Sequence, residues 1–181
     1  MKDLQEETRT GLVSVIIMAI VFTAGVITPG ILVLDYVHVL YGALWTGVDV
    51  FLGVIFFIVI NNLDKNIKSD IAERLMPMTL YFIPAISVFT VSSGIALGIR
   101  EKIIVLNPLF IGIFIIAGLL LLLTVIFVLP LSLRMYEEFL KENPSREGIS
   151  KNLIKISKVA VVQLIFQVVI ISLMAYIVVY P

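Results

Sequence analysis

The sequence predicts an all-α protein, a polytopic bundle of five transmembrane helices in a single membrane domain. Three observations lead to this prediction. Hydrophobic residues make up 60% of the 181-residue chain and charged residues only 14%, whereas roughly a quarter of the residues of a soluble domain are charged. Five segments each contain the run of about 20 predominantly apolar residues that a helix needs to cross a membrane. The lysines and arginines fall between these segments in a strongly uneven way.

We expect the five spans at residues 11–28, 31–60, 75–99, 108–133 and 156–179. Pro29 and Gly30 separate the first two spans and predict a tight turn, because proline cannot continue a helix and glycine allows the chain to reverse. The first span could also be a cleaved secretory signal, but no Ala-x-Ala site precedes the turn. Pro84 predicts a kink in the third span.

Two segments between the spans are polar. Residues 61–74 mix charges with apolar residues at four-residue steps, which predicts a short helix lying at the cytoplasmic membrane interface. Residues 134–155 form a second cytoplasmic segment, in which Pro144 and Gly148 interrupt charged helical extensions of the neighbouring spans.

The distribution of basic residues predicts the orientation. With five spans, the N-terminus and the second and fourth loops lie on one side, and only Arg100 and Lys102 lie on the other. The eleven basic residues of the first side are Lys2, Arg9, Lys65, Lys68, Arg74, Arg134, Lys141, Arg146, Lys151, Lys155 and Lys158. Because lysine and arginine are retained in the cytoplasm, we expect a multi-pass protein of the cell membrane with a cytoplasmic N-terminus and an extracytoplasmic C-terminus at Pro181.

The second span carries an intramembrane stripe of polar and small residues. Asp35, His38, Gly42, Trp45 and Asp49 follow one another at steps of three and four residues, which places them on one face of a helix. His38 and Trp45 are the only histidine and the only tryptophan of the chain. Polar groups inside a membrane are costly and face protein or a cavity. The stripe is therefore the candidate site.

The third and fifth spans supply polar groups that can face this stripe. The outward half of the third span, PAISVFTVSSGIALG, is rich in small and hydroxyl residues, which let helices approach and hydrogen bond. In the fifth span, Gln167 lies at a depth comparable with that of Asp49. We therefore predict a buried hydrogen bond between these two side chains.

The composition excludes several classes of function. The formal net charge is +0 and no basic patch contains aromatic residues, so a nucleic-acid partner is not expected. The chain has no cysteine, which rules out disulfides, thiolate metal sites and cysteine nucleophiles. It also has no nucleophile elbow, Walker loop, dinucleotide glycine pattern or HExxH motif. The sequence therefore does not favour an enzyme and indicates no catalytic residue.

One motif resembles a known group of small membrane proteins. In VHVLYGALWTG, His38 is followed by Trp45 seven residues later and then by Gly47. A later stretch, AERLMPMTLYFIPAISVFTVSSGIALG, has a charged start, Pro84 in mid-span and Gly94 about three turns later. These features resemble the copper-resistance-D-like family and the haem-binding, oxygen-independent protoporphyrinogen oxidase family.

This resemblance implies that His38 is a haem ligand. The oxidase family has a lysine three residues before the histidine, where this chain has Asp35. The family has a further lysine in a later span, whereas the apolar cores of the fourth and fifth spans of this chain contain no lysine. The oxidase activity is therefore not carried over. A haem b or copper ligand at His38 would leave Asp35 to hold the second ring nitrogen, with Trp45 packing beside the ligand.

Three functions remain open at this stage. The favoured one is a non-catalytic structural or accessory subunit of a larger membrane complex, with other subunits or a second copy as partners in the bilayer. The first alternative is a haem- or copper-binding protein that uses His38 for electron transfer or metal handling, with Met76 and Met78 as weaker copper ligands. The second is a small ion or proton transporter that uses Asp35, His38 and Asp49.

Overall fold

The computed structural model describes residues 2–102, 104 and 108–179, and within them the chain is helical apart from short turns. The helical segments in chain order are α1 (Lys2–Ile27), α2 (Leu32–Val50), η1 (Phe51–Phe56), α3 (Phe57–Asn61), α4 (Lys65–Pro77), η2 (Met78–Phe82), α5 (Ile83–Glu101), α6 (Pro108–Leu123), η3 (Thr124–Val128), α7 (Leu129–Phe139) and α8 (Arg146–Val179). The three η segments are π-helical turns that join the α-helices on either side.

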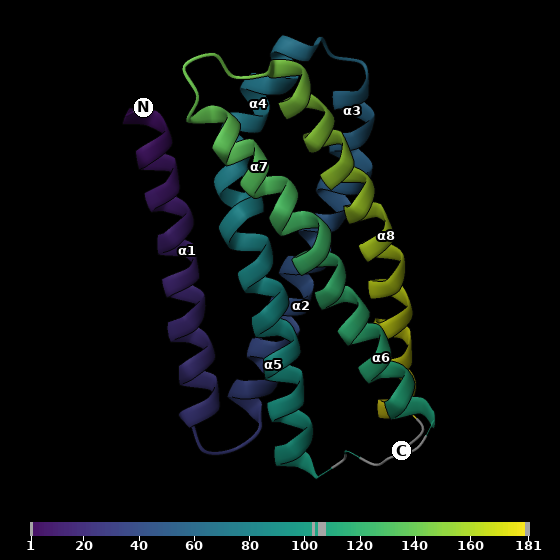
Figure 1. Ribbon diagram of the computed structural model, residues 1–181. Helices are drawn as coiled ribbons and strands as arrows, with labels where there is room; N and C mark the ends of the chain where they lie inside the picture. Colours follow the sequence, from purple (N-terminus) through teal and green to yellow (C-terminus); the bar gives the residue numbers. More distant parts are fainter. Residues whose placement is uncertain (1, 103, 105–107, 180–181) are drawn as a thin grey trace.

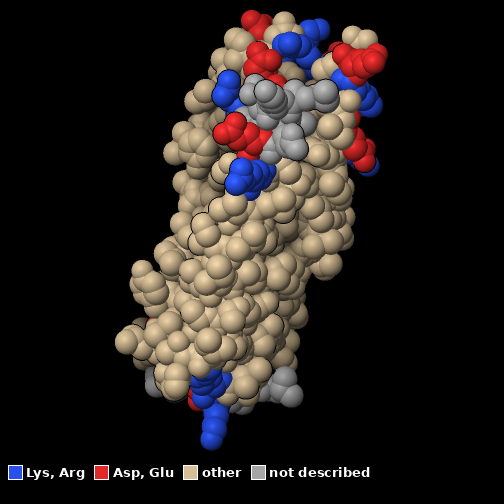
Figure 2. Space-filling view, turned by 90° about the vertical axis from the view of Figure 1, so that its left-hand side faces the viewer, with Lys and Arg blue, Asp and Glu red and all other residues tan. Residues whose placement is uncertain are grey.

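These segments form a bundle of five long helices, as predicted (Figure 1). In the described part of the chain, five helices are long and apolar enough to cross a membrane, and they cover Thr8–Ile27, Leu32–Asn61, Lys65–Glu101, Pro108–Phe139 and Arg146–Val179. Charged side chains gather at the two ends of the molecule, and the wide band between them on the face seen in Figure 2 is free of them. This distribution is typical of a helical membrane protein.

The two ends of the bundle differ in the number of lysines and arginines in their segments, eleven at one end and two at the other. The start of α1, the turn before α4 and the connection between α7 and α8 lie together at what we call the basic end (Figure 1). The turn between α1 and α2 and the C-terminal ends of α5 and α8 lie at the opposite, distal end. This arrangement agrees with the predicted grouping of the loops. Met1 and Pro181 themselves lie outside the described residues.

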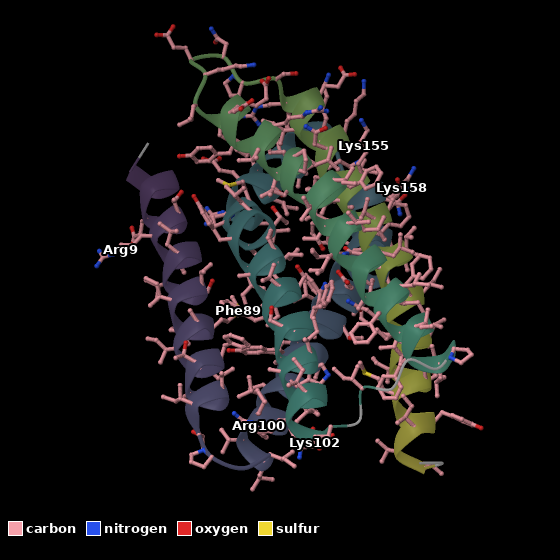
Figure 3. All side chains as sticks on the ribbon, turned by 60° about the horizontal axis from the view of Figure 1, so that its bottom comes forward. Arg9, Phe89, Arg100, Lys102, Lys155 and Lys158 are labelled. Carbon is pink, nitrogen blue, oxygen red and sulfur yellow. The ribbon has the colours of Figure 1, made fainter. Side chains whose placement is uncertain are left out.

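The predicted turn at Pro29 and Gly30 is confirmed. The chain bends between Ile27 and Leu32, and Gly30 has a φ of 92°, which a residue with a side chain rarely adopts. Arg100 of α5 holds this turn: its guanidinium donates hydrogen bonds to the carbonyl oxygens of Val26, Thr28 and Gly30 at 2.6, 3.0 and 2.7 Å. In Figure 3, Arg100 lies beside this end of α1. One side chain thus satisfies carbonyl groups that the end of a helix leaves without partners.

Two of the π-helical turns have a cause in the sequence. Pro84 and Pro130 each follow a π-helical turn by two residues, after η2 and η3 respectively. A proline ring clashes with the carbonyl group four residues earlier, which here lies inside the π-helical turn. The wider turn accommodates the ring without interrupting the helix. The helix is therefore distorted just before Pro84, whereas the kink expected there stays a prediction.

The segment at residues 61–74 differs from the prediction of a separate interfacial helix. Its helical part, α4, continues through η2 into α5 as one helix of 37 residues from Lys65 to Glu101. Ala72 is fully buried and Ser69 is nearly so, whereas Ile67, expected on the apolar face, is 46% exposed. The reason is packing against α8, which four-residue spacing cannot reveal. The predicted segment 134–155 is mostly helix, because only residues 140–145 separate α7 from α8.

A large part of the apolar core lies toward the basic end of the bundle. There, one cluster joins the second, third, fourth and fifth long helices through buried side chains that include Leu52, Ile83, Met135 and Leu153. Gly53 permits the closest approach, because a Cβ atom at this position would lie 2.7 Å from the backbone nitrogen of Val161. The helices therefore cross in direct backbone contact at η1 and α8.

Candidate functional site: a groove at the distal end

The helices separate toward the distal end and leave a groove with a volume of about 920 Å³ between α2 and α5 on one side and α6 and α8 on the other. It runs from Asp35 to Trp45 along α2, about 15 Å at the usual rise per residue. Most of its wall is apolar, with Phe110, Ile113 and Ile170 among the lining side chains. A concave apolar site with few polar groups is typical of small-molecule binding.

The predicted stripe of α2 forms the polar wall of this groove. Asp35, His38, Gly42 and Trp45 all line it. Asp49, the fifth member, is 1% exposed and does not line the groove itself; it lies at the floor behind Gln167, a lining residue to which it is hydrogen bonded. The helical spacing therefore placed the five residues on one side correctly, and the structure adds that this side faces a groove and not only another helix.

His38 is held in a defined orientation by α5. Its Nδ1 lies 3.0 Å from the carbonyl oxygen of Thr90 and 3.2 Å from Oγ of Ser93. Because a carbonyl oxygen can only accept, Nδ1 carries the proton and donates it to Thr90. The ring packs against Gly94, where a Cβ atom would lie 2.7 Å from Cε1 of His38. Nε2 is therefore the ring nitrogen left for a ligand.

The role expected for Asp35 is thereby corrected. The sequence suggested that Asp35, one turn before His38, would hold the second ring nitrogen, but the Thr90 carbonyl occupies that position. Asp35 is exposed instead and lines the mouth of the groove together with Glu101 of α5. No lysine or arginine is among the described residues that line the groove. Its mouth is consequently acidic.

The floor of the groove contains a buried polar cluster. Nε2 of Gln167 donates a hydrogen bond of 2.8 Å to Oδ2 of Asp49, which confirms the predicted pair. One turn away, Nε2 of Gln163 donates to Oγ1 of Thr124 at 2.9 Å. Several atoms of this cluster are buried without a hydrogen-bond partner among the described residues. They are Nε1 of Trp45, Oδ1 of Asp49, Oε1 of Gln163 and Oε1 of Gln167.

A bare metal site is not supported by the described residues. No group of three or more histidine, cysteine, aspartate or glutamate side chains lies close enough together to hold a metal ion in that part of the chain. Met76 is fully buried in an apolar cluster with Leu80. It also lies 14 residues before Thr90, about 21 Å along the helix, so Met76 and the adjacent Met78 are not brought to His38.

Thr90 and Gly94 belong to the stretch of the third span that was expected to face the stripe. The sequence did not predict what either does at His38, and Met174 was missed. Thr90 orients the imidazole through a backbone carbonyl, which no side-chain pattern encodes. Gly94 was expected to let the helices approach, and its lack of a side chain makes room for the imidazole ring of His38. Met174 of α8 lines the groove. Its one signal was its position on the same helix as Gln167, seven residues later, which is two helical turns.

Comparison with known proteins adds no relative. No protein-family model, no curated protein and no solved structure matches the chain. The resemblance to copper-resistance-D-like and haem-binding oxidase families therefore stays a prediction.

Proposed function

We propose that this chain is an integral membrane protein that binds one largely apolar molecule in the groove, and that haem b is the ligand to which its donor groups are suited. The observation that carries the proposal is the orientation of His38. Histidines that bind a metal commonly donate the other ring nitrogen's proton to a carbonyl or carboxylate group. Here Nδ1 does so to Thr90, at 3.0 Å.

The rest of the groove fits haem in part. Its apolar walls suit a porphyrin, and a histidine on α2 together with Met174 on α8 is a donor pair known for haem iron. When bound, haem would supply one-electron chemistry. The acidic mouth fits less well, because Asp35 and Glu101 would repel propionate groups unless these extend past them.

Absorbance spectroscopy tests the proposal. Protein purified in detergent after expression with ample haem should show a Soret band, and His38→Ala should abolish it. Gly94→Ala gives a sharper test, because the histidine is retained but the new Cβ would lie 2.7 Å from Cε1 of His38 and displace the ring. The matched control is Gly47→Ala on the same helix as His38, at a position that does not line the groove and where a new Cβ would have no atom within 4 Å.

We expect Gly94→Ala to weaken haem binding by tenfold or more, as changes in the residues that orient a metal-binding side chain do, and Gly47→Ala to leave it unchanged. Met174→Ala should retain the band with an altered shape, because one of the two side chains that would hold the iron is removed while His38 remains. A colourless wild-type protein, or a band that survives His38→Ala, contradicts the proposal.

The acidic mouth favours a second candidate, a carrier of lipophilic cations. Asp35 and Glu101 would attract a cation to the mouth, and the apolar walls would accept its body. Binding of tetraphenylphosphonium by the purified protein, lost in the Asp35→Asn, Glu101→Gln double variant, would support it. Absence of binding excludes this candidate and leaves the haem proposal unaffected. No observation favours the accessory-subunit role over these two, and it stays a prediction.

The proposed orientation places the basic end in the cytoplasm, since eleven of the thirteen lysines and arginines belong to that side. The groove then opens toward the extracytoplasmic surface. Figure 3 shows Arg100 and Lys102 at the distal end, and Lys155 and Lys158 farther along α8 toward the basic end.

A further inference from the structure

The polar cluster at the floor of the groove is not used by the proposed ligand at His38. Along α2, Asp49 lies 11 residues beyond His38, about 16 Å deeper in the bundle. Its side chain is 1% exposed, and that of its partner Gln167 is 3% exposed. The apolar cluster around Leu52 closes the bundle on the side of the basic end. This pair therefore communicates with the surroundings through the groove.

Among the described residues around Asp49, no positive charge compensates its carboxylate. The groove is lined by no lysine or arginine among its described residues, and its titratable side chains are Asp35, His38 and Glu101. In the neighbouring helices, η1, α6 and η3 contain no charged residue, and α8 contains none after Lys158. An ionised carboxylate in such surroundings is strongly disfavoured unless a cation or several donors stabilise it. Gln167 supplies one donor.

The hydrogen bonding of the pair is half complete. Nε2 of Gln167 donates to Oδ2 of Asp49 at 2.8 Å, whereas Oδ1 of Asp49 and Oε1 of Gln167 are both buried without a partner. Both of these atoms are acceptors when the carboxyl group is ionised. A single proton on Oδ1 makes it a donor, and it can then bond to Oε1. Carboxylic acid and amide would form a cyclic pair with two antiparallel hydrogen bonds.

We propose that Asp49 is a proton-binding site, which holds its proton in a carboxylic acid–amide pair with Gln167 at the floor of the groove. The proton enters and leaves through the groove when a water molecule, or a proton donor on a ligand, reaches the floor. Binding in the groove and protonation of Asp49 are then coupled, because whatever occupies the floor changes the stability of the acid form. This inference does not depend on haem and goes beyond it.

Infrared spectroscopy of the ligand-free protein tests the inference. Aspartate labelled with ¹³C at Cγ separates aspartate bands from glutamate bands. At neutral pH the folded wild-type protein should show the carbonyl stretch of a protonated aspartic acid, and this band should shift in D₂O. Asp49→Asn should remove the band, whereas Asp35→Asn, which changes the exposed carboxyl at the mouth, should retain it.

Gln167→Leu provides the second test. It removes both hydrogen bonds of the pair, so the acid carbonyl band should move to higher frequency without disappearing. Asp49→Asn should melt at the same temperature as the wild type, because an asparagine can both accept from Gln167 and donate to it as the acid does. If Asp49→Asn does not fold, the wild-type, Asp35→Asn and Gln167→Leu spectra still decide the question.

Three results overturn the proposal: no protonated aspartic acid in the folded wild type, a band that survives Asp49→Asn, or a band that Asp35→Asn removes. A melting temperature that rises with sodium or potassium, with only carboxylate bands present, would instead identify an ionised Asp49 that binds a cation. Because all spectra are recorded without haem, their outcome is independent of the Soret experiment.

Discussion

The contact between η1 and α8 allows a prediction whose size follows from the structure. A Cβ atom added in Gly53→Ala would lie 2.7 Å from the nitrogen of Val161, 3.0 Å from the carbonyl carbon of Ala160 and 3.1 Å from Cα of Val161. All three are backbone atoms, so no side chain can turn aside. To reach the 3.4 Å at which ordinary contact begins, the two helices must separate locally by about 0.7 Å.

This separation has a cost that can be bounded. Overpacking a core typically costs about 1–3 kcal/mol, and we expect the upper part of that range because the backbone itself must move. Alanine is the better helix former by up to about 1 kcal/mol, which offsets part of the loss. The free energy of unfolding should therefore fall by about 1–2 kcal/mol, which is a roughly 5- to 30-fold change in the folding equilibrium.

Equilibrium unfolding of the purified protein by sodium dodecyl sulfate in mixed micelles measures this loss, followed by circular dichroism or by the fluorescence of Trp45. The matched control is Gly47→Ala on α2, where a new Cβ would have no atom within 4 Å. It should leave the protein unchanged or slightly more stable, since only helix propensity changes. Equal stability of the Gly53→Ala and Gly47→Ala variants would refute the close crossing of η1 and α8.

Three further predictions concern other parts of the bundle. Tyr41→Phe removes the 2.6 Å hydrogen bond from the phenol to the carbonyl oxygen of Met18 but keeps the ring against Phe89. The free energy of unfolding should fall by about 0.6–1.7 kcal/mol in the same assay, and an unchanged value would contradict that bond. Arg100→Ala leaves three carbonyl oxygens of the α1–α2 turn without their donor and should raise the rate of proteolysis in that turn. Lys102→Ala, which removes a cation two residues away, should leave the rate of proteolysis unchanged. Single cysteines at Asn62 and Ser145 should resist an impermeant thiol reagent added outside intact cells, and one at Glu101 should react; the reverse pattern would invert the proposed orientation.

Local patterns predicted the candidate site well where the information lies within one helix. The steps of three and four residues from Asp35 to Asp49 placed the stripe on one side of α2, and equal depth in the bilayer paired Asp49 with Gln167 at 2.8 Å. The error at Asp35 arose because its nearness to His38 in the sequence was taken for contact. Thr90 is 52 residues away in the chain, and a backbone carbonyl has no residue type that would reveal it.

The sequence by itself determined that this protein is an all-helical bundle with five apolar spans, because hydrophobic length and the charges between the spans are local properties that every helix carries independently. It also determined the turn at Gly30 and the distortion before Pro84, which follow from the backbone geometry of single residues. Only the tertiary structure decided that α4 and α5 are one helix, that Gly53 meets the backbone of α8, and that the bundle separates into a groove at the distal end. These features depend on which faces of the helices pack against each other and how closely they approach. Both are determined by contacts between residues far apart in the chain.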